Sequence, residues 1–238
     1  MRFAGERRAL AAAVLSFFML QLLLAGLLDD GPFRPVLLGL GIAYLLAFVG
    51  VVAGWFWARW YTLGLAFSGI VLAVMAGWQN GMAIIVYVLG GTHLAVALAL
   101  LGDEAASFYD GRRDWRARWR MDDNAVNRLG KAVMRAGASL PYLIVAGLAP
   151  RQGSGLDLVA FAGLALGAAG LAGLVRMRTW GVLALAGGAA LTLTSLETSH
   201  LAGWFSPAPW IAAILLAAAV VPFAAPIARS LGWALRRD

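Results

Sequence analysis

Residues 60–102 read WYTLGLAFSGIVLAVMAGWQNGMAIIVYVLGGTHLAVALALLG, a segment without Asp, Glu, Lys or Arg. A helix crosses a bilayer core of roughly 30 Å with about 20 apolar residues. The segment is therefore about twice as long as one crossing requires. Its middle, residues 77–81, reads GWQNG, which is typical of a turn. These features predict two membrane-spanning helices joined by that turn.

Further apolar segments lie on both sides of residues 60–102. One of them contains Arg135, whose long side chain can extend from a helix end to the lipid headgroups. Together with residues 60–102 they predict an all-α integral membrane protein with eight transmembrane helices. The additional predicted spans are residues 9–28, 35–58, 132–149, 158–175, 179–196 and 208–228.

The composition agrees with a membrane protein and excludes several other classes. Hydrophobic residues make up 62% of the 238 residues, charged residues 13%, and the mean hydropathy is +0.80. Soluble domains are about half apolar and about a quarter charged. The apolar content excludes a disordered chain, and the absence of cysteine excludes disulfides, iron–sulfur clusters and Cys-ligated zinc.

The distribution of basic residues predicts the orientation of the chain. If the N-terminus is cytoplasmic and there are eight spans, all of the 19 Lys and Arg residues except Arg34 and Arg151 fall on the cytoplasmic side. We therefore expect both termini to be cytoplasmic, and we expect the first apolar segment to be retained rather than cleaved as a signal peptide. Lys131 is the only lysine, and this arginine bias is typical of a GC-rich bacterium, which indicates the bacterial inner membrane.

Two similar turns indicate an internal repeat. Residues 58–65 read ARWYTLGL and residues 177–184 read MRTWGVLA, an offset of 119 residues. An even number of spans per half gives both halves the same orientation. We therefore predict two tandem four-helix halves, residues 1–102 and 131–238, in parallel orientation. The alternative is that Arg and Trp occur twice as interfacial anchors.

Residues 103–130 form a long basic linker between the predicted halves. Trp115 and Trp119 are four positions apart and share one face of a helix. The pattern predicts an amphipathic helix on the membrane surface, or else an intracellular protein contact, rather than nucleic-acid binding. Asp122 or Asp123 is expected to cap a following helix that buries residues 126, 129 and 133. The candidate contact residues of the linker are Arg112, Arg113, Trp115, Arg116 and Trp119.

Glycines and prolines predict how the helices pack. Gly163, Gly167, Gly170 and Gly173 line the sixth predicted span and permit close helix approach, within one chain or between subunits. Prolines 141, 222 and 226 are each expected to free a backbone carbonyl. The loop before the last span carries Trp204 and Phe205, which either contact a partner or lie at the lipid interface.

Few side chains in the predicted spans can support chemistry. His93 lies about halfway along the fourth span and is a candidate for a proton relay or a haem ligand, or else an imidazole satisfied by a neighbouring helix. Glu197 and His200 are three apart at the outer end of the seventh span, a spacing that suits a proton or metal site, although two ligands do not complete one. We predict no catalytic residue, metal or cofactor.

These patterns favour a non-enzymatic membrane protein. The leading hypothesis is a scaffold, assembly factor or accessory subunit that contacts other membrane proteins or a second copy of itself. The alternative is a transporter, channel or lipid-handling protein for a neutral or apolar substrate, in which one half moves against the other. A lipid-modifying enzyme would have to use Glu197 and His200, the only pair near an interface that we nominate.

Overall fold

The structure is a computed structural model that describes residues 2–81, 83–110, 121–150, 157–195 and 206–225. These residues form helices and connecting turns, with no strand among them, which confirms the predicted all-α class. The helices are α1 (Arg2–Leu28), α2 (Arg34–Ala53), α3 (Ala58–Asn80), α4 (Ile84–Leu100), α5 (Asp103–Asp110), α7 (Asp123–Leu148), α8 (Leu158–Val175), α9 (Trp180–Thr194), α10 (Ala208–Val220) and the 3-10 turn η2 (Val221–Phe223).

Four of the described helices are long and apolar enough to cross a membrane: Gly5–Leu28, Arg34–Ala53, Ala58–Gln79 and Leu158–Val175. The adjoining helices α4 and α5 give a fifth such segment only if they are taken together, and they are bent by 70° relative to each other. Helices α9 and α10 are apolar but shorter. The structure therefore supports a helical membrane protein, and the count of eight spans stays a prediction.

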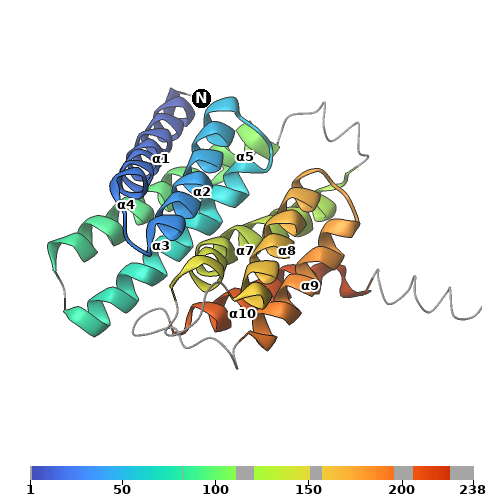
Figure 1. Cartoon of the computed structure of the whole chain (residues 1–238). Coiled ribbons are helices and arrows are strands. Elements are labelled where there is room, and N and C mark those ends of the chain that lie inside the picture. The colour runs from blue at the N-terminus through green and yellow to red at the C-terminus, as the bar shows by residue number, and fades with distance from the viewer. Residues whose placement is uncertain (1, 82, 111–120, 151–156, 196–205, 226–238) are drawn as a thin grey trace, which may run out of the picture.

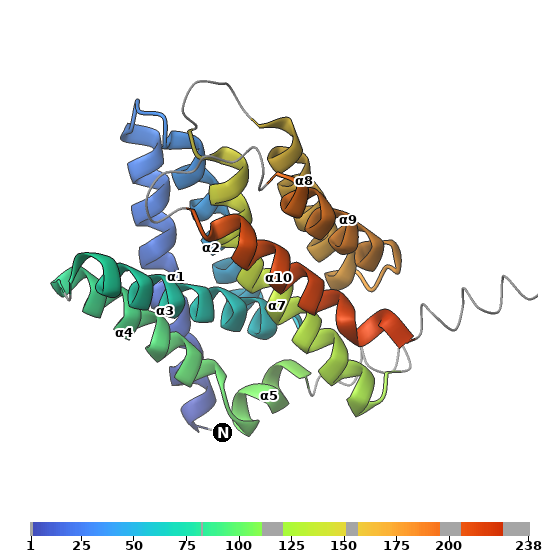
Figure 2. The same ribbon diagram turned by 90° about the horizontal axis from the view of Figure 1, so that it is seen from below.

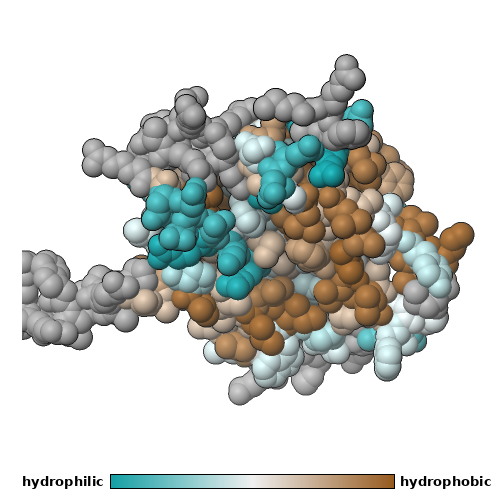
Figure 3. Space-filling view, turned by 180° about the vertical axis from the view of Figure 1, so that it is seen from behind, coloured by the Kyte–Doolittle hydropathy of each residue, from teal (hydrophilic) through white to brown (hydrophobic). Residues whose placement is uncertain are grey.

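Apolar side chains are abundant on the outside of the molecule. Leu28 and Ile84 are each 82% exposed and Leu158 is 76% exposed. Figure 3 shows a broad apolar area on one face, with the hydrophilic residues gathered toward one side of it. Because soluble monomers rarely expose apolar areas of this kind, this surface is suited to contact with lipid.

The helices form two groups that meet at α3 and α7. Figure 1 shows α1–α4 on one side and α7–α10 on the other, and Figure 2 shows α3 and α4 running crosswise to α1. Glycines bring the two groups together: a Cβ at Gly64 of α3 would lie 2.7 Å from the backbone nitrogen of Ala138 in α7. The Ser68 hydroxyl also donates to the Ala138 carbonyl at 2.6 Å. The first and second groups are therefore joined along their centre by backbone contact.

The second predicted span ends earlier than the sequence indicated. Helix α2 ends at Ala53 because Gly54 adopts a left-handed conformation, with φ 66°. The amide of Gly54 donates to Val51, and the amide of Trp55 donates to Gly50, at 3.2 and 3.0 Å. These two backbone hydrogen bonds form the Schellman motif, which terminates many helices. The predicted end at residue 58 is wrong, since the turn occupies residues 54–57.

Helix α7 confirms the predicted N-terminal cap and is longer than the span predicted at residues 132–149. The Asp122 side chain accepts a 2.6 Å bond from the Ala125 amide, and residues 126, 129 and 133 are buried, as the capping pattern predicted. However, α7 runs without a break from Asp123 to Leu148. The capped helix and the span predicted at 132–149 therefore belong to one helix, and the bounds of that span stay a prediction.

Arg135 of α7 forms a hydrogen bond with another helix, and its expected reach to the headgroups stays a prediction. Its Nη1 donates to the carbonyl of Ala218 in α10 at 2.8 Å. Pro222 stands four residues after Ala218 and has no amide hydrogen for that carbonyl. The carbonyl that Pro222 leaves free is thus satisfied by an arginine from another helix.

Candidate functional site at His93

The His93 site lies where the first four helices meet. His93 projects from α4 and is only 2% exposed. Tyr44 of α2, Phe18 of α1 and Gly69 of α3 contact it. Among the candidate site residues predicted from sequence, His93 is the one that the structure describes.

Both ring nitrogens of His93 are engaged by groups of the chain itself. Nδ1 lies 2.7 Å from the Leu89 carbonyl one turn earlier in α4. Nε2 lies 2.6 Å from the Tyr44 hydroxyl. A carbonyl only accepts, so Nδ1 carries the hydrogen and donates it, and in the neutral ring Nε2 accepts the hydrogen of the Tyr44 hydroxyl. In a neutral ring this network selects the tautomer with the hydrogen on Nδ1, and it links α4 to α2.

Aromatic rings enclose the rest of the imidazole. The Phe18 ring centroid lies 4.6 Å from that of His93, and Tyr44 lies edge-on to His93 at 5.9 Å. Phe18 and Tyr44 are themselves 5.5 Å apart. Three of the four helices thus contribute rings to one closed cluster.

The backbone of α3 at Gly69 closes the remaining side of the His93 site, because glycine has no side chain. A Cβ at this position would overlap the His93 ring. The glycine therefore allows the imidazole to pack directly on the backbone of α3, as small residues do where helices approach closely.

A small cavity borders the cluster. It has a volume of about 10 Å³ and is lined by His93, Tyr44 and the buried Thr62, among others. Among the described residues, the Thr62 hydroxyl is the buried side-chain group that has no hydrogen-bond partner. This volume is at the lower limit of what one water molecule needs. The cavity is therefore too small for a substrate.

The remaining predicted site residues lie outside the described residues. They are Glu197, His200, Arg112, Arg113, Trp115, Arg116, Trp119, Trp204 and Phe205. Within the described part of the chain, no three His, Asp or Glu side chains lie close enough to hold a metal ion together.

The partners of His93 were not predicted from sequence. Tyr44 carried a signal, because it is the one residue with a side-chain hydroxyl in the segment predicted as the second span. A hydroxyl in lipid must find an acceptor or donor. Nothing in the sequence indicated that Phe18 and Gly69 would contact His93, since phenylalanine and glycine are common in membrane-spanning helices.

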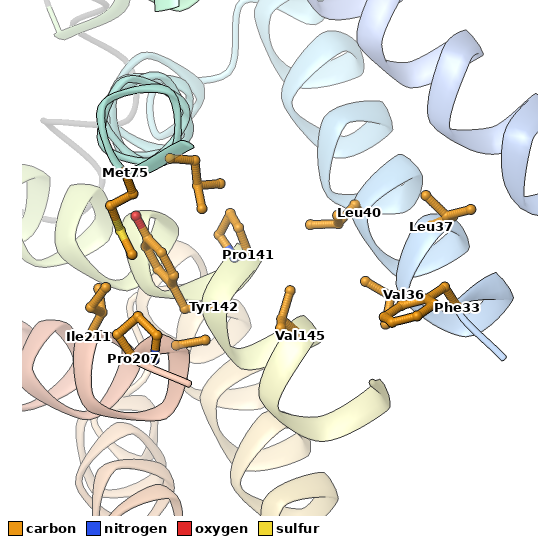
Figure 4. A pocket seen from close by; sticks show the side chains of 12 residues that line it. Phe33, Val36, Leu37, Leu40, Met75, Pro141, Tyr142, Val145, Pro207 and Ile211 are labelled. Carbon is orange, nitrogen blue, oxygen red and sulfur yellow. The ribbon is translucent and has the colours of Figure 1, made fainter. Parts of the chain in front are cut away.

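The described residues also line crevices between the helix groups that are larger than the cavity at His93. The first, of about 270 Å³, is lined by apolar side chains of α2, α3, α7 and α10. Figure 4 shows Phe33, Val36, Leu37 and Leu40 facing Tyr142 and Val145 across it. The second, of about 650 Å³, lies between the α2–α3 turn and α8. Both volumes are close to those of sites that hold small molecules.

We name the larger opening the α2–α8 crevice. Its lining includes the apolar side chains of Leu46, Leu140 and Leu171, and the N–H donors of Trp55, Trp57 and Arg176. The rings of Trp55 and Trp57 lie 5.3 Å apart. Comparison of the chain with known protein families, curated proteins and solved structures finds no match.

Proposed function

We propose that this chain is an eight-helix protein of the bacterial inner membrane that acts without catalysis, as a scaffold, assembly factor or accessory subunit of a larger membrane complex. The observation that carries the proposal is the closed state of His93. Both of its nitrogens bind groups of the same chain, and the adjoining cavity measures only about 10 Å³. An imidazole held in this way joins helices rather than handling a substrate.

The other interior polar groups support the same role. The Tyr61 hydroxyl donates to the Ala43 carbonyl at 3.1 Å, and the Tyr142 hydroxyl donates to the Ser68 carbonyl at 3.4 Å. Ion-coupled carriers need polar groups that bind and release an ion inside the membrane. In this chain, these two hydroxyls donate to backbone carbonyls of neighbouring helices. Such bonds suit a bundle whose helices stay in place.

Arginines at helix ends support the proposed threading. Arg8, near the start of α1, binds the Val52 carbonyl at the end of α2. Arg59, near the start of α3, donates to the Leu100 carbonyl at the end of α4, at 2.9 Å. The start of α1 thus lies beside the end of α2, and the start of α3 beside the end of α4, so each of these two consecutive pairs is antiparallel, in keeping with the proposed threading. Arginine at a helix C-terminus is also favoured by the helix dipole.

Chemical cross-linking in intact cells, followed by purification in mild detergent, tests the proposed role. We expect the chain to run as an assembly larger than its detergent-bound monomer, with a defined partner or a second copy in fixed ratio. A monomer that is stable, solitary and not cross-linked contradicts the proposal.

The second candidate is a lipid-handling protein, favoured by the apolar crevice of about 270 Å³ between α2, α3, α7 and α10. Transfer of a fluorescent phospholipid between the leaflets of protein-containing liposomes tests it. Ala208→Trp, which fills the crevice from α10, is expected to slow a genuine transfer. Transfer at the rate of protein-free liposomes contradicts this candidate while leaving the scaffold role intact.

A further inference from the structure

The α2–α8 crevice combines an apolar lining with unsatisfied donors. Leu140 and Leu171, which are buried, and Leu46, which is 46% exposed, belong to this lining. Arg176 also lines the crevice; it is exposed and makes no hydrogen bond or ion pair with the described residues. Such a combination matches a molecule that has an apolar chain and an anionic head.

Two indoles add donors beside Arg176. The ring centroids of Trp55 and Trp57 lie 5.3 Å apart with the planes tilted by 38°, and Trp57 also packs against Tyr61. Within the described structure, neither indole N–H has a hydrogen-bond partner, and Trp55 is 45% exposed. Tryptophan is typical of the level of the lipid headgroups, where one end of the ring is apolar and the other is wet.

The positive charge of Arg176 indicates what kind of molecule occupies the α2–α8 crevice. Arg176 ends α8, and the sequence places it on the side of the chain that carries nearly all of the basic residues. That side faces the cytoplasmic leaflet, in which anionic lipids are enriched. Basic pockets between membrane helices on this side bind anionic lipid headgroups.

We infer that the α2–α8 crevice binds one anionic phospholipid of the inner leaflet. Its phosphate accepts hydrogen bonds from Arg176 and from the indoles of Trp55 and Trp57, and an acyl chain lies along Leu46, Leu140 and Leu171. The volume of about 650 Å³ lies within the range of ligand sites and accommodates an acyl chain. The bound lipid fills the gap between α2 and α8 and so joins the two helix groups.

Native mass spectrometry of the purified full chain tests the site. The delipidated protein is offered equal amounts of phosphatidylglycerol and phosphatidylcholine with identical acyl chains. Both lipids carry the phosphate, but the choline cation of phosphatidylcholine cancels its negative charge, whereas phosphatidylglycerol stays anionic. We therefore expect one phosphatidylglycerol per chain, preferred about fivefold or more, since the attraction of one arginine to a net anionic lipid is worth roughly that factor. Arg176→Gln is expected to remove this preference, and Ala172→Trp, which fills the crevice, is expected to remove the bound lipid altogether.

The matched control is Arg178→Gln, because Arg178 belongs to the same turn but does not line the crevice. It is expected to keep the preference, and thermal unfolding without lipid verifies that each variant folds. The inference is overturned if the wild type shows no preference, if Arg176→Gln or Ala172→Trp binds like the wild type, or if Arg178→Gln loses the preference equally. It rests on the proposed membrane location, and a membrane-inserted chain without the preference contradicts the lipid site alone.

Discussion

The Tyr44 hydroxyl lies 2.6 Å from Nε2 of His93, although 49 residues separate them in the chain. Because the Leu89 carbonyl occupies the other ring nitrogen, this contact completes the hydrogen bonding of the imidazole. It also joins α2 to α4 inside the first helix group. A polar residue in the middle of an apolar span thus has a structural explanation.

Removing the Tyr44 hydroxyl is expected to destabilise the protein. Tyr44→Phe keeps the ring but leaves Nε2 of His93 buried without a partner. In membrane proteins such bonds contribute about 0.6–2 kcal/mol, and an orphaned buried group costs a similar amount. Thermal unfolding in detergent measures the loss. Tyr87→Phe is the control, since Tyr87 also belongs to this helix group but is 60% exposed; an equal loss in both variants contradicts the account.

Adding one methyl group at Gly69 is expected to disturb His93. Gly69→Ala places a Cβ within the imidazole ring, so the histidine or α3 must shift. Overpacking of this kind costs about 1–3 kcal/mol. Gly91→Ala in α4 is the control, because a Cβ there has no atom within 4 Å. The two variants are compared by their unfolding temperatures, and a Gly69→Ala protein as stable as Gly91→Ala would mean that His93 is not packed on α3.

Arg135 and Pro222 are expected to be coupled. Arg135→Leu leaves the Ala218 carbonyl without its donor and should destabilise the chain by about 1–2 kcal/mol. Pro222→Ala restores an amide hydrogen four residues after that carbonyl. The double variant should therefore lose less unfolding free energy than the sum of the losses in the two single variants. Strict additivity in this double-mutant cycle contradicts the proposed exchange of donors.

Ser68 is expected to contribute to the junction of the helix groups. Its hydroxyl donates to the Ala138 carbonyl of α7, so Ser68→Ala removes a bond between α3 and α7. The expected loss in unfolding free energy is about 1 kcal/mol. Ser107→Ala is a suitable control, because the Ser107 hydroxyl donates only within α5, to the Glu104 carbonyl. Equal stability of Ser68→Ala and Ser107→Ala contradicts a role for this bond at the junction.

The sequence predicted local features well because they depend on neighbouring residues. The apolar segments became helices, and the Asp122 cap and the carbonyl freed by Pro222 followed from rules that span three or four residues. It did not predict which groups meet across helices. The Arg135 side chain donates a hydrogen bond to the Ala218 carbonyl, 83 residues further along the chain. Nothing in the sequence near either residue indicates this pairing.

The His93 site shows the same division. The position of the histidine in an apolar span was visible in the sequence, and so was the lone side-chain hydroxyl of the second predicted span, that of Tyr44. The absence of a side chain at Gly69 acquires meaning only when α3 and α4 are placed together. The end of α2 was missed because Gly54 is followed by more apolar residues, which hide the turn that its left-handed backbone makes.

Labelling of single introduced cysteines in intact cells tests the central claim most directly, because the chain has no cysteine of its own. The account predicts that a membrane-impermeant maleimide reacts from outside with Asp30→Cys and Gln79→Cys, whereas Glu6→Cys and Arg178→Cys react only after the cells are opened. Reaction of Glu6→Cys and Arg178→Cys on opposite sides of the membrane, or recovery of the chain as a soluble protein without detergent, would contradict it.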